Sequence, residues 1–305
     1  MLEPGRRVLL DAHNAYPYSG QWGDRLDRAL STGLPIAIEQ DLVWHRDPGT
    51  GRAWSIVSHG DPFTGREPTL EAYFFERVRP LVEQALREDR RQTWPLIVLN
   101  LDFKTDEPEH HAAVWATLGR YESWLTIATR TANATEVAAL EPGPVLVFAG
   151  ESDAQERSFH ERVPPGAKLR VFGAVHSRPA ARKDVPPDRA APPDVQSAPK
   201  TNYRRWWNLP WEVVEAGGQT EAGDWTAADE ARLRTLVAAG HAAGLWVRVF
   251  ALNGHDPADR SQGWIGTYNF GSRAAAELRW RAAIDAGVDF VAVDQYEELA
   301  RMLRR

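Results

Sequence analysis

Short apolar runs separated by amphipathic stretches recur along the whole chain, and this alternation is the feature that most limits the folds open to it. Strands covered on both faces have near-continuous apolar sequences, unlike strands with one face in water. Eight runs of this kind can be recognised: Val8–His13, Pro35–Leu42, Leu96–Asp102, Leu125–Thr129, Val145–Ala149, Leu169–Val175, Trp246–Leu252 and Phe290–Val293. Eight buried strands with helical segments between them predict an α/β fold, a single (β/α)8 barrel of the TIM type.

The helical segments between these runs have their own start and stop signals. Trp22–Ser31 and Thr69–Glu88 carry apolar residues at helical spacing, and Pro80 is expected to kink the second helix. Thr226 followed by Asp229 predicts a helix that begins with a capping box. The expected stop signals are glycines that directly precede a strand: Gly33, Gly244 and Gly287.

The chain of 305 residues is predicted to be one domain, 1–305, because α/β barrels routinely exceed the usual domain size. A Pro- and Trp-rich insertion is expected over 176–225, after strand six. Two interpretations of its tryptophans stay open: a lid or lipid-contacting surface that allows peripheral membrane contact, or a small core of the loop itself. The tryptophans are Trp206, Trp207, Trp211 and Trp225.

Composition excludes several classes of function. A net charge of -6 argues against a nucleic-acid partner, which would need a basic face. The absence of cysteine excludes disulfides, thiolate catalysis and cysteine metal sites. No stretch approaches the roughly 20 apolar residues of a membrane span, and no apolar segment of signal-peptide length follows the N-terminus. The chain as it stands is therefore expected to be soluble and cytoplasmic, or secreted if a signal peptide once preceded it.

Polar side chains gather at the carboxyl ends of the first three predicted strands. Side chains two residues apart on a strand point to the same face, and the carboxyl ends of barrel strands form one rim. We therefore expect these side chains to meet at one site, joined by residues that end the last two strands. The set is His13, Asn14, Glu39, Asp41, Asn100, Asp102 and Lys104 from the first three strands, with Asn253 and Asp294 from the last two.

Three carboxylates at one place predict a metal site. Gathering Glu39, Asp41 and Asp102 is unfavourable unless a cation offsets their charge. Hard divalent cations prefer oxygen ligands, so one Mg²⁺ or Ca²⁺ is favoured over Zn²⁺. The amide oxygen of Asn14 is a candidate fourth ligand.

Two histidines suit proton transfer near neutral pH at such a site. His13 ends the first strand, and His59 follows a short apolar run, so we expect them to act as general acid and base. Lys104 is expected to hold a phosphate oxygen. Asn253 and Asp294 are candidate substrate-binding residues, with a structural hydrogen-bonding role as the alternative for Asp294. The remaining histidines of interest are predicted to lie on the surface: His45, His110, His111, His160 and His241.

These motifs resemble the phospholipase C-like phosphodiesterase superfamily, above all the catalytic domain of phosphatidylinositol-specific phospholipases C. DAHNAYP (11–17) resembles the first-histidine motif, AIEQDL (37–42) the Glu-x-Asp metal motif, and VSHG (57–60) the second-histidine motif. LWVRVFALN (245–253) and DAGVDFVAVDQYEEL (285–299) resemble the closing segments of the related glycerophosphodiester phosphodiesterases. The chain departs from the latter at Asn14-Ala15, where those enzymes have Arg-Gly, and at Asp102, where they have Glu.

The resemblance implies metal-assisted attack on a phosphodiester bond of a small-molecule or lipid substrate. It implies that His13 and His59 form the acid–base pair, and that Glu39, Asp41 and Asp102 bind the metal. Two alternatives remain open at this stage. One is a glycoside hydrolase, with two carboxylates as acid and nucleophile and tryptophans as sugar platforms. The other is an inactive barrel that serves as a binding module.

Overall fold

The structure is a computed structural model that describes residues 3–18, 20–60, 62–133, 135–177, 185–186, 189–195, 199–215, 222–256, 258 and 269–304. The chain is divided into two compact units. The first comprises Asn14–Gly173 and Thr201–Tyr203, and the second comprises the N-terminal strand and most of the chain from residue 174 onward.

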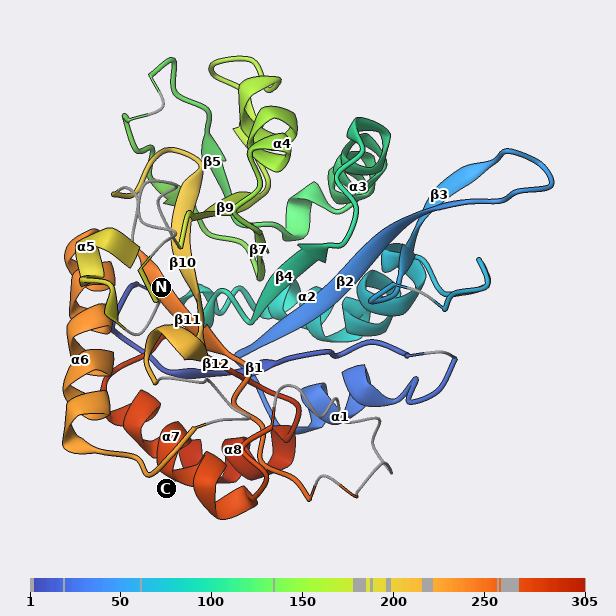
Figure 1. The fold of residues 1–305 in the computed structure, drawn as a ribbon. Helices are drawn as coiled ribbons and strands as arrows, with labels where there is room; N and C mark the ends of the chain where they lie inside the picture. Colours follow the sequence, from blue (N-terminus) through green and yellow to red (C-terminus); the bar gives the residue numbers. More distant parts are fainter. Residues whose placement is uncertain are drawn as a thin grey trace. The chain divides into compact units, whose positions relative to one another are not determined.

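The first unit is built on a parallel sheet that carries one antiparallel strand (Figure 1). The parallel strands β2 (Ile36–Arg46), β4 (Ile97–Phe103), β7 (Val145–Ala149) and β9 (Phe172–Val175) lie side by side in this order. The long strand β2 continues into a hairpin with β3 (Ala53–Val57), which pairs with it antiparallel. The interior of β4 and all of β7 are buried, as expected for strands covered on both faces.

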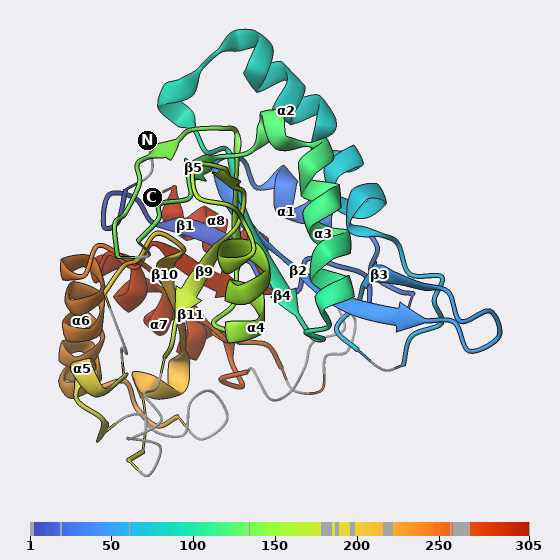
Figure 2. The same cartoon turned by 90° about the horizontal axis from the view of Figure 1, so that it is seen from above.

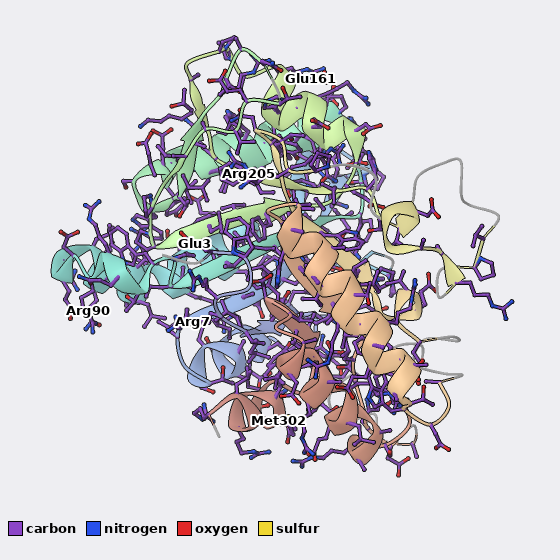
Figure 3. All side chains as sticks on the ribbon, turned by 90° about the vertical axis from the view of Figure 1, so that its left-hand side faces the viewer. Glu3, Arg7, Arg90, Glu161, Arg205 and Met302 are labelled. Atoms are coloured by element: carbon purple, nitrogen blue, oxygen red, sulfur yellow. The ribbon has the colours of Figure 1, made fainter. Side chains whose placement is uncertain are left out.

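Helices and a second small sheet complete this unit. Helix α3 packs against β3 and against the π-helical turn η4 (Figure 2). Charged side chains such as Arg90 and Glu161 point into solvent (Figure 3). The helical elements are α1 (Arg25–Ser31), η1 (Glu71–Phe75), α2 (Glu76–Glu88), η2 (Arg91–Thr93), α3 (Pro108–Arg120), η3 (Glu122–Trp124), α4 (Asp153–Glu156) and η4 (Arg157–Glu161).

The second unit holds the other four parallel strands. They are ordered β10 (Arg204–Pro210), β11 (Trp246–Phe250), β12 (Phe290–Val293) and β1 (Leu9–Ala12), so the first strand of the chain pairs with the last. Helices α6, α7 and α8 pack on β11, β12 and β1, respectively (Figure 1). The helical elements are α5 (Pro192–Val195), η7 (Trp211–Val213), α6 (Ala227–Ala242), α7 (Arg273–Asp285) and α8 (Tyr296–Leu303).

Eight parallel strands alternating with helices give the predicted fold class, a (β/α)8 barrel. One predicted barrel strand is wrong. Within Leu125–Thr129, β5 (Ile127–Thr129) pairs antiparallel with β6 (Leu140–Glu141) and β8 (Lys168–Leu169) in a separate sheet. The true sixth barrel strand is β10, which has two arginines and an asparagine and so lacks the apolar run by which a buried strand is recognised.

The insertion expected over 176–225 is not confirmed with these bounds, because the barrel strand β10 lies within them. The interpretations of its tryptophans also need correction. Trp206 and Trp207 are on the barrel strand β10, and they and Trp211 are at most 1% exposed, so the first two are buried side chains of the barrel and not a core of the loop itself. A lipid-contacting surface made of them is wrong. Trp225 is partly exposed and stacks on Trp211 at 5.6 Å between ring centroids.

The predicted start and stop signals are confirmed. The Thr226 hydroxyl accepts a hydrogen bond from the Asp229 backbone N–H, and the Asp229 carboxylate accepts one from the Thr226 N–H, which completes the capping box of α6. Gly244 and Gly287 follow α6 and α7 with φ of 73° and 77°, a left-handed conformation that glycine adopts without strain. No helix among the described residues is long and apolar enough to cross a membrane.

Four of the five histidines predicted at the surface are instead buried: His45, His110, His111 and His160. His110 lies on the inner side of α3 and illustrates the reason. Its ring nitrogens pair with the hydroxyls of Ser55 and Thr105, both at 2.9 Å, and its ring stacks on Trp44. A buried imidazole is acceptable when both nitrogens have partners. Burial lowers the pKa of His110 to about 4.

The depressed pKa of His110 predicts acid-sensitive stability. The unfolded chain binds a proton at this residue near pH 6.5 and the folded chain only near pH 4, so stability is full above the first value and is lost as the pH falls towards the second. Lowering the pH from about 7 to about 5 should cost roughly 2 kcal/mol through this residue. Urea unfolding of wild type and His110→Gln at both pH values measures it. Equal pH dependence in the two proteins would contradict the assignment.

Candidate active site

Two neighbouring strands bring the predicted acidic residues together. Strands β2 and β4 are parallel and in register, with Glu39 opposite Asn100 and Asp41 opposite Asp102. Because alternate residues on a strand point to the same face, the four side chains form a two-by-two array on one face of the sheet. The short spacing between neighbouring strands therefore forces three carboxylates into one cluster.

The three carboxylates of this cluster each offer an oxygen within 4.8 Å of the others. Glu39 and Asp41 are buried, whereas the Asp102 side chain is 43% exposed. The cluster is thus closed around two of its members and open to solvent at the third. Glu39 also accepts a hydrogen bond from the Asn100 amide at 3.3 Å, which fixes one of its oxygens.

Lys104 supplies a positive charge to the cluster. Its ammonium lies 3.0 Å from Asp41 Oδ2 and 2.7 Å from Asp102 Oδ2. Burial acts against the charged form of Lys104, but the attraction of Asp41 and Asp102 outweighs it and raises the pKa of the ammonium above its ordinary value. One ammonium therefore faces three carboxylates, and the described part of the cluster keeps a net negative charge.

Asp41 is the carboxyl group most affected by this excess negative charge. Burial, together with the charges of Asp102 and Glu39, raises the pKa of its carboxyl well above the ordinary value, although Lys104 opposes the rise. Among the described residues its Oδ1 has no hydrogen-bond partner. Buried carboxylate oxygens are normally paired with a donor or a cation. An all-oxygen cluster with an unbonded oxygen fits a hard divalent cation.

Asn14 sits in a turn beside Glu39. Its backbone N–H donates to Glu39 Oε2 at 3.0 Å, and its φ of 54° is one that asparagine tolerates better than most residues. The Tyr16 hydroxyl donates to Asn14 Oδ1 at 2.5 Å, and the buried Arg25 donates to the Asn14 carbonyl at 3.2 Å. The predicted fourth ligand thus lies at the cluster, with its side-chain oxygen already accepting one bond.

His59 is placed by the hairpin. Strand β3 runs back along β2 until the Ser58 N–H donates to the Asp41 carbonyl at 3.0 Å, so His59 follows directly after a residue bonded to the cluster strand. Its imidazole is partly exposed and meets the Tyr18 ring edge-on, 6.2 Å between centroids. The first unit therefore brings together six predicted residues and sets His59 next to them in the strand pairing.

The remaining predicted residues meet in the second unit. His13 Nδ1 lies 2.8 Å from Asp294 Oδ1, and both side chains are more than nine-tenths buried. The Asn253 amide donates to Asp294 Oδ2 at 2.9 Å and accepts from the Asp294 backbone N–H at 2.7 Å. The Tyr296 hydroxyl donates to the His13 carbonyl at 2.7 Å. This chain of bonds fixes the orientation of the His13 ring.

Sequence reasoning missed several supporting residues. Tyr16 and Arg25, which hold the Asn14 turn, left no signal beyond an aromatic residue two positions after Asn14. Arg248 forms a buried ion pair with Asp11 at 2.5 Å and donates to the Asn208 side chain at 3.0 Å. An arginine in the middle of an apolar strand is the clue, because its charge needs a buried partner.

The fold can now be compared with solved structures. A calcium-dependent phosphoinositol-specific phospholipase C from a Gram-negative bacterium, Pseudomonas sp, matches with a TM-score of 0.51 and 15% sequence identity, covering 97% of this chain and 91% of that chain. The fold resemblance predicted from the sequence is confirmed. An HPPK-DHPS in complex with substrates matches with a TM-score of 0.50 and 10% identity, covering 100% of this chain and 51% of that one. Neither a protein-family model nor a curated protein matches.

Loss of the Lys104 charge should destabilise the chain and increase its response to cations. In Lys104→Met the three carboxylates lose their ammonium, which we expect to cost about 1 to 2 kcal/mol, discounted for the exposure of Asp102. The melting temperature of the variant should be roughly 2 to 4 °C below that of wild type in the absence of metal. Added calcium chloride should raise the melting temperature of the variant more than that of wild type, measured by calorimetry.

Lys168→Met is the matched control, since it removes a surface ion pair with Glu122 away from the cluster. Equal melting temperatures in wild type and Lys104→Met, with equal increases on adding calcium, would show that Lys104 does not balance the charge of the cluster.

Proposed function

We propose that the chain is a metal-dependent phosphoric diester hydrolase that acts on a phospholipid or a glycerophosphodiester. The observation that carries the proposal is the carboxylate cluster on β2 and β4, in which the buried Oδ1 of Asp41 has no hydrogen-bond donor from the described part of the chain. A fold like that of a calcium-dependent phospholipase C supports it. The partly exposed side of the cluster, at Asp102 and Lys104, is where a charged diester can approach.

Glu39, Asp41 and Asp102 would hold the cation, with Asn14 Oδ1 as a further oxygen ligand. Ca²⁺ and Mg²⁺ both suit an all-oxygen set. When bound, the cation supplies positive charge that stabilises negative charge developing on the phosphate. The Lys104 ammonium, relieved of balancing the carboxylates, can bind a non-bridging phosphate oxygen.

His13 and His59 are the proposed acid–base pair. One accepts the proton of the attacking hydroxyl, and the other donates a proton to the leaving oxygen. Because Asp294 accepts at Nδ1 of His13, the ring keeps its proton there and exchanges protons with substrate through Nε2. We therefore assign Asp294 and Asn253 a positioning role, in place of the substrate contact expected from sequence.

The cluster geometry disfavours glycoside hydrolysis. The two carboxyl groups of a retaining glycosidase lie about 5 to 5.5 Å apart, and those of an inverting one about 6.5 to 9.5 Å apart. Here three carboxylates have oxygens within 4.8 Å of one another, and Lys104 bridges two of them. Of the four tryptophans proposed as sugar platforms, Trp206, Trp207 and Trp211 are buried, and Trp225 is partly exposed.

A phosphorus NMR screen tests the proposal. Phosphatidylinositol, lysophospholipids and glycerophosphodiesters are incubated with the protein and either Ca²⁺ or Mg²⁺. We expect turnover of at least one diester, complete loss with chelator, and recovery when the cation is restored. The phosphorus shift separates a cyclic phosphate, formed by attack of the substrate's own hydroxyl, from an open monoester formed by water. Turnover that persists in chelator would contradict the role of the cluster.

Two variants assign the proton transfer. His13→Ala should lower kcat by about 10² to 10⁴-fold, because a general acid or base is lost. Asp294→Asn should lower kcat with little change in KM, since an amide can donate to Nδ1 and force the wrong tautomer. His241→Gln, which alters a histidine bonded to Asp289, serves as the control with full activity. Full activity of His13→Ala would overturn the mechanism.

A further inference from the structure

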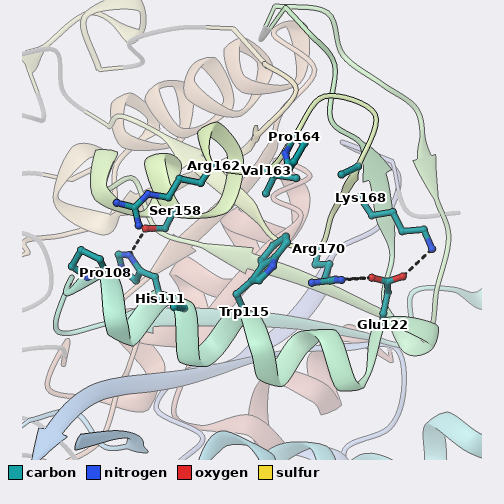
Figure 4. A pocket seen from close by; sticks show the side chains of 12 residues that line it. Pro108, His111, Trp115, Glu122, Ser158, Arg162, Val163, Pro164, Lys168 and Arg170 are labelled. Atoms are coloured by element: carbon teal, nitrogen blue, oxygen red, sulfur yellow. Dashed lines mark hydrogen bonds and ion pairs between the residues drawn. The ribbon is translucent and has the colours of Figure 1, made fainter.

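We propose that the first unit carries a second ligand site, a pocket beside α3 that binds a small organic anion. The pocket has a volume of about 430 Å³, within the range of sites for small metabolites. It lies between α3, the turn η4 and the segment around β8 (Figure 4). None of the residues of the carboxylate cluster lines it, so this site is independent of the proposed phosphodiesterase activity.

An apolar wall runs along the pocket. Trp115, on α3, stands between the end formed by Ser158 and Arg162 and the end formed by Arg170 and Glu122 (Figure 4). Val163 and Pro164 add further apolar lining. The indole and the neighbouring apolar side chains favour a ligand with an apolar body, because its burial removes hydrocarbon from water.

The charges in the pocket favour an anion. Lys168 and Arg170 both pair with Glu122, at 2.9 Å and 2.7 Å, so this end keeps one excess positive charge. Arg162, at the other end, makes no ion pair with any described residue, and its side chain lines the pocket. The lining thus carries three cations and one carboxylate, although the net charge of the chain is -6. An acid group of the ligand would pair with Arg162.

A hydrogen-bond chain below the pocket defines what Ser158 can offer. His111 Nε2 lies 3.1 Å from Asp106 Oδ1, and His111 Nδ1 lies 3.0 Å from Ser158 Oγ. The carboxylate is an acceptor, so the imidazole proton is on Nε2 and Nδ1 accepts the serine hydroxyl proton. Burial lowers the pKa of His111, which keeps the ring neutral. Ser158 Oγ therefore presents lone pairs that accept a hydrogen bond from the ligand.

These features define a chemical class: an organic acid with an apolar body and a hydroxyl or amine donor. The probe is 4-hydroxyphenylacetate, and isothermal calorimetry measures its binding in the absence of any diester substrate or metal. We expect a Kd at or below about 1 mM. The neutral amide of the same probe should bind at least about tenfold more weakly, because it cannot pair with Arg162. Phenylacetate, which lacks the donor, should bind several-fold more weakly.

Variants localise the binding. Arg162→Met should weaken binding of 4-hydroxyphenylacetate about tenfold, and Arg162 is exposed, so the change leaves the fold intact. Ser158→Ala should weaken binding of the hydroxylated probe but leave phenylacetate unchanged. Arg157→Met is the matched control, because Arg157 is an exposed arginine of the same turn that does not line the pocket.

Three outcomes would overturn the proposal: equal affinity for the acid and its amide, unchanged binding in Arg162→Met, or no binding at about 10 mM probe. Loss of probe binding with diester turnover intact would refute this site alone. Loss of turnover with probe binding intact would refute the phosphodiesterase proposal alone.

Discussion

The in-register pairing of β2 with β4 is the constraint on which the candidate active site depends. It fixes Glu39 beside Asn100 and Asp41 beside Asp102, so the backbone keeps the three acidic residues at neighbouring positions on one face of the sheet. Their repulsion has to be balanced within that geometry. Lys104 balances part of it, and Asp41 Oδ1, which no described residue hydrogen-bonds, marks the part that remains. The surrounding bonds from the Asn14 N–H and the Asn100 amide hold Glu39 in place.

The carboxylate cluster could be predicted from the sequence because it follows from two local rules. Residues two apart share a strand face, and the carboxyl ends of parallel strands meet at one edge. Strand β10 could not be predicted in this way, because two buried arginines and a partly exposed asparagine interrupt its apolar run. Arg204, for example, donates to the Ala174 carbonyl at 2.6 Å. Hydrophobic periodicity carries no information about such bonds.

The burial of several histidines also could not be predicted from sequence periodicity. His110 and His111 are polar in any composition-based view, yet each is enclosed because hydroxyls or carboxylates from other segments satisfy both ring nitrogens. The contact between His13 and Asp294 joins residues 281 positions apart, so sequence spacing could not predict it either. It changes the role we propose for Asp294 from touching substrate to orienting the His13 ring, a distinction that depends on a 2.8 Å contact.

The central claim is that the cluster on β2 and β4 is a divalent-cation site. The most direct test is calcium binding by isothermal calorimetry to the metal-free chain and to Asp41→Asn, with Glu109→Gln as a surface carboxylate control. We expect one ion per chain for wild type and for the control, and loss of that binding in Asp41→Asn. Equal binding by all three proteins, or diester turnover by a wild-type chain that binds no cation, would contradict it.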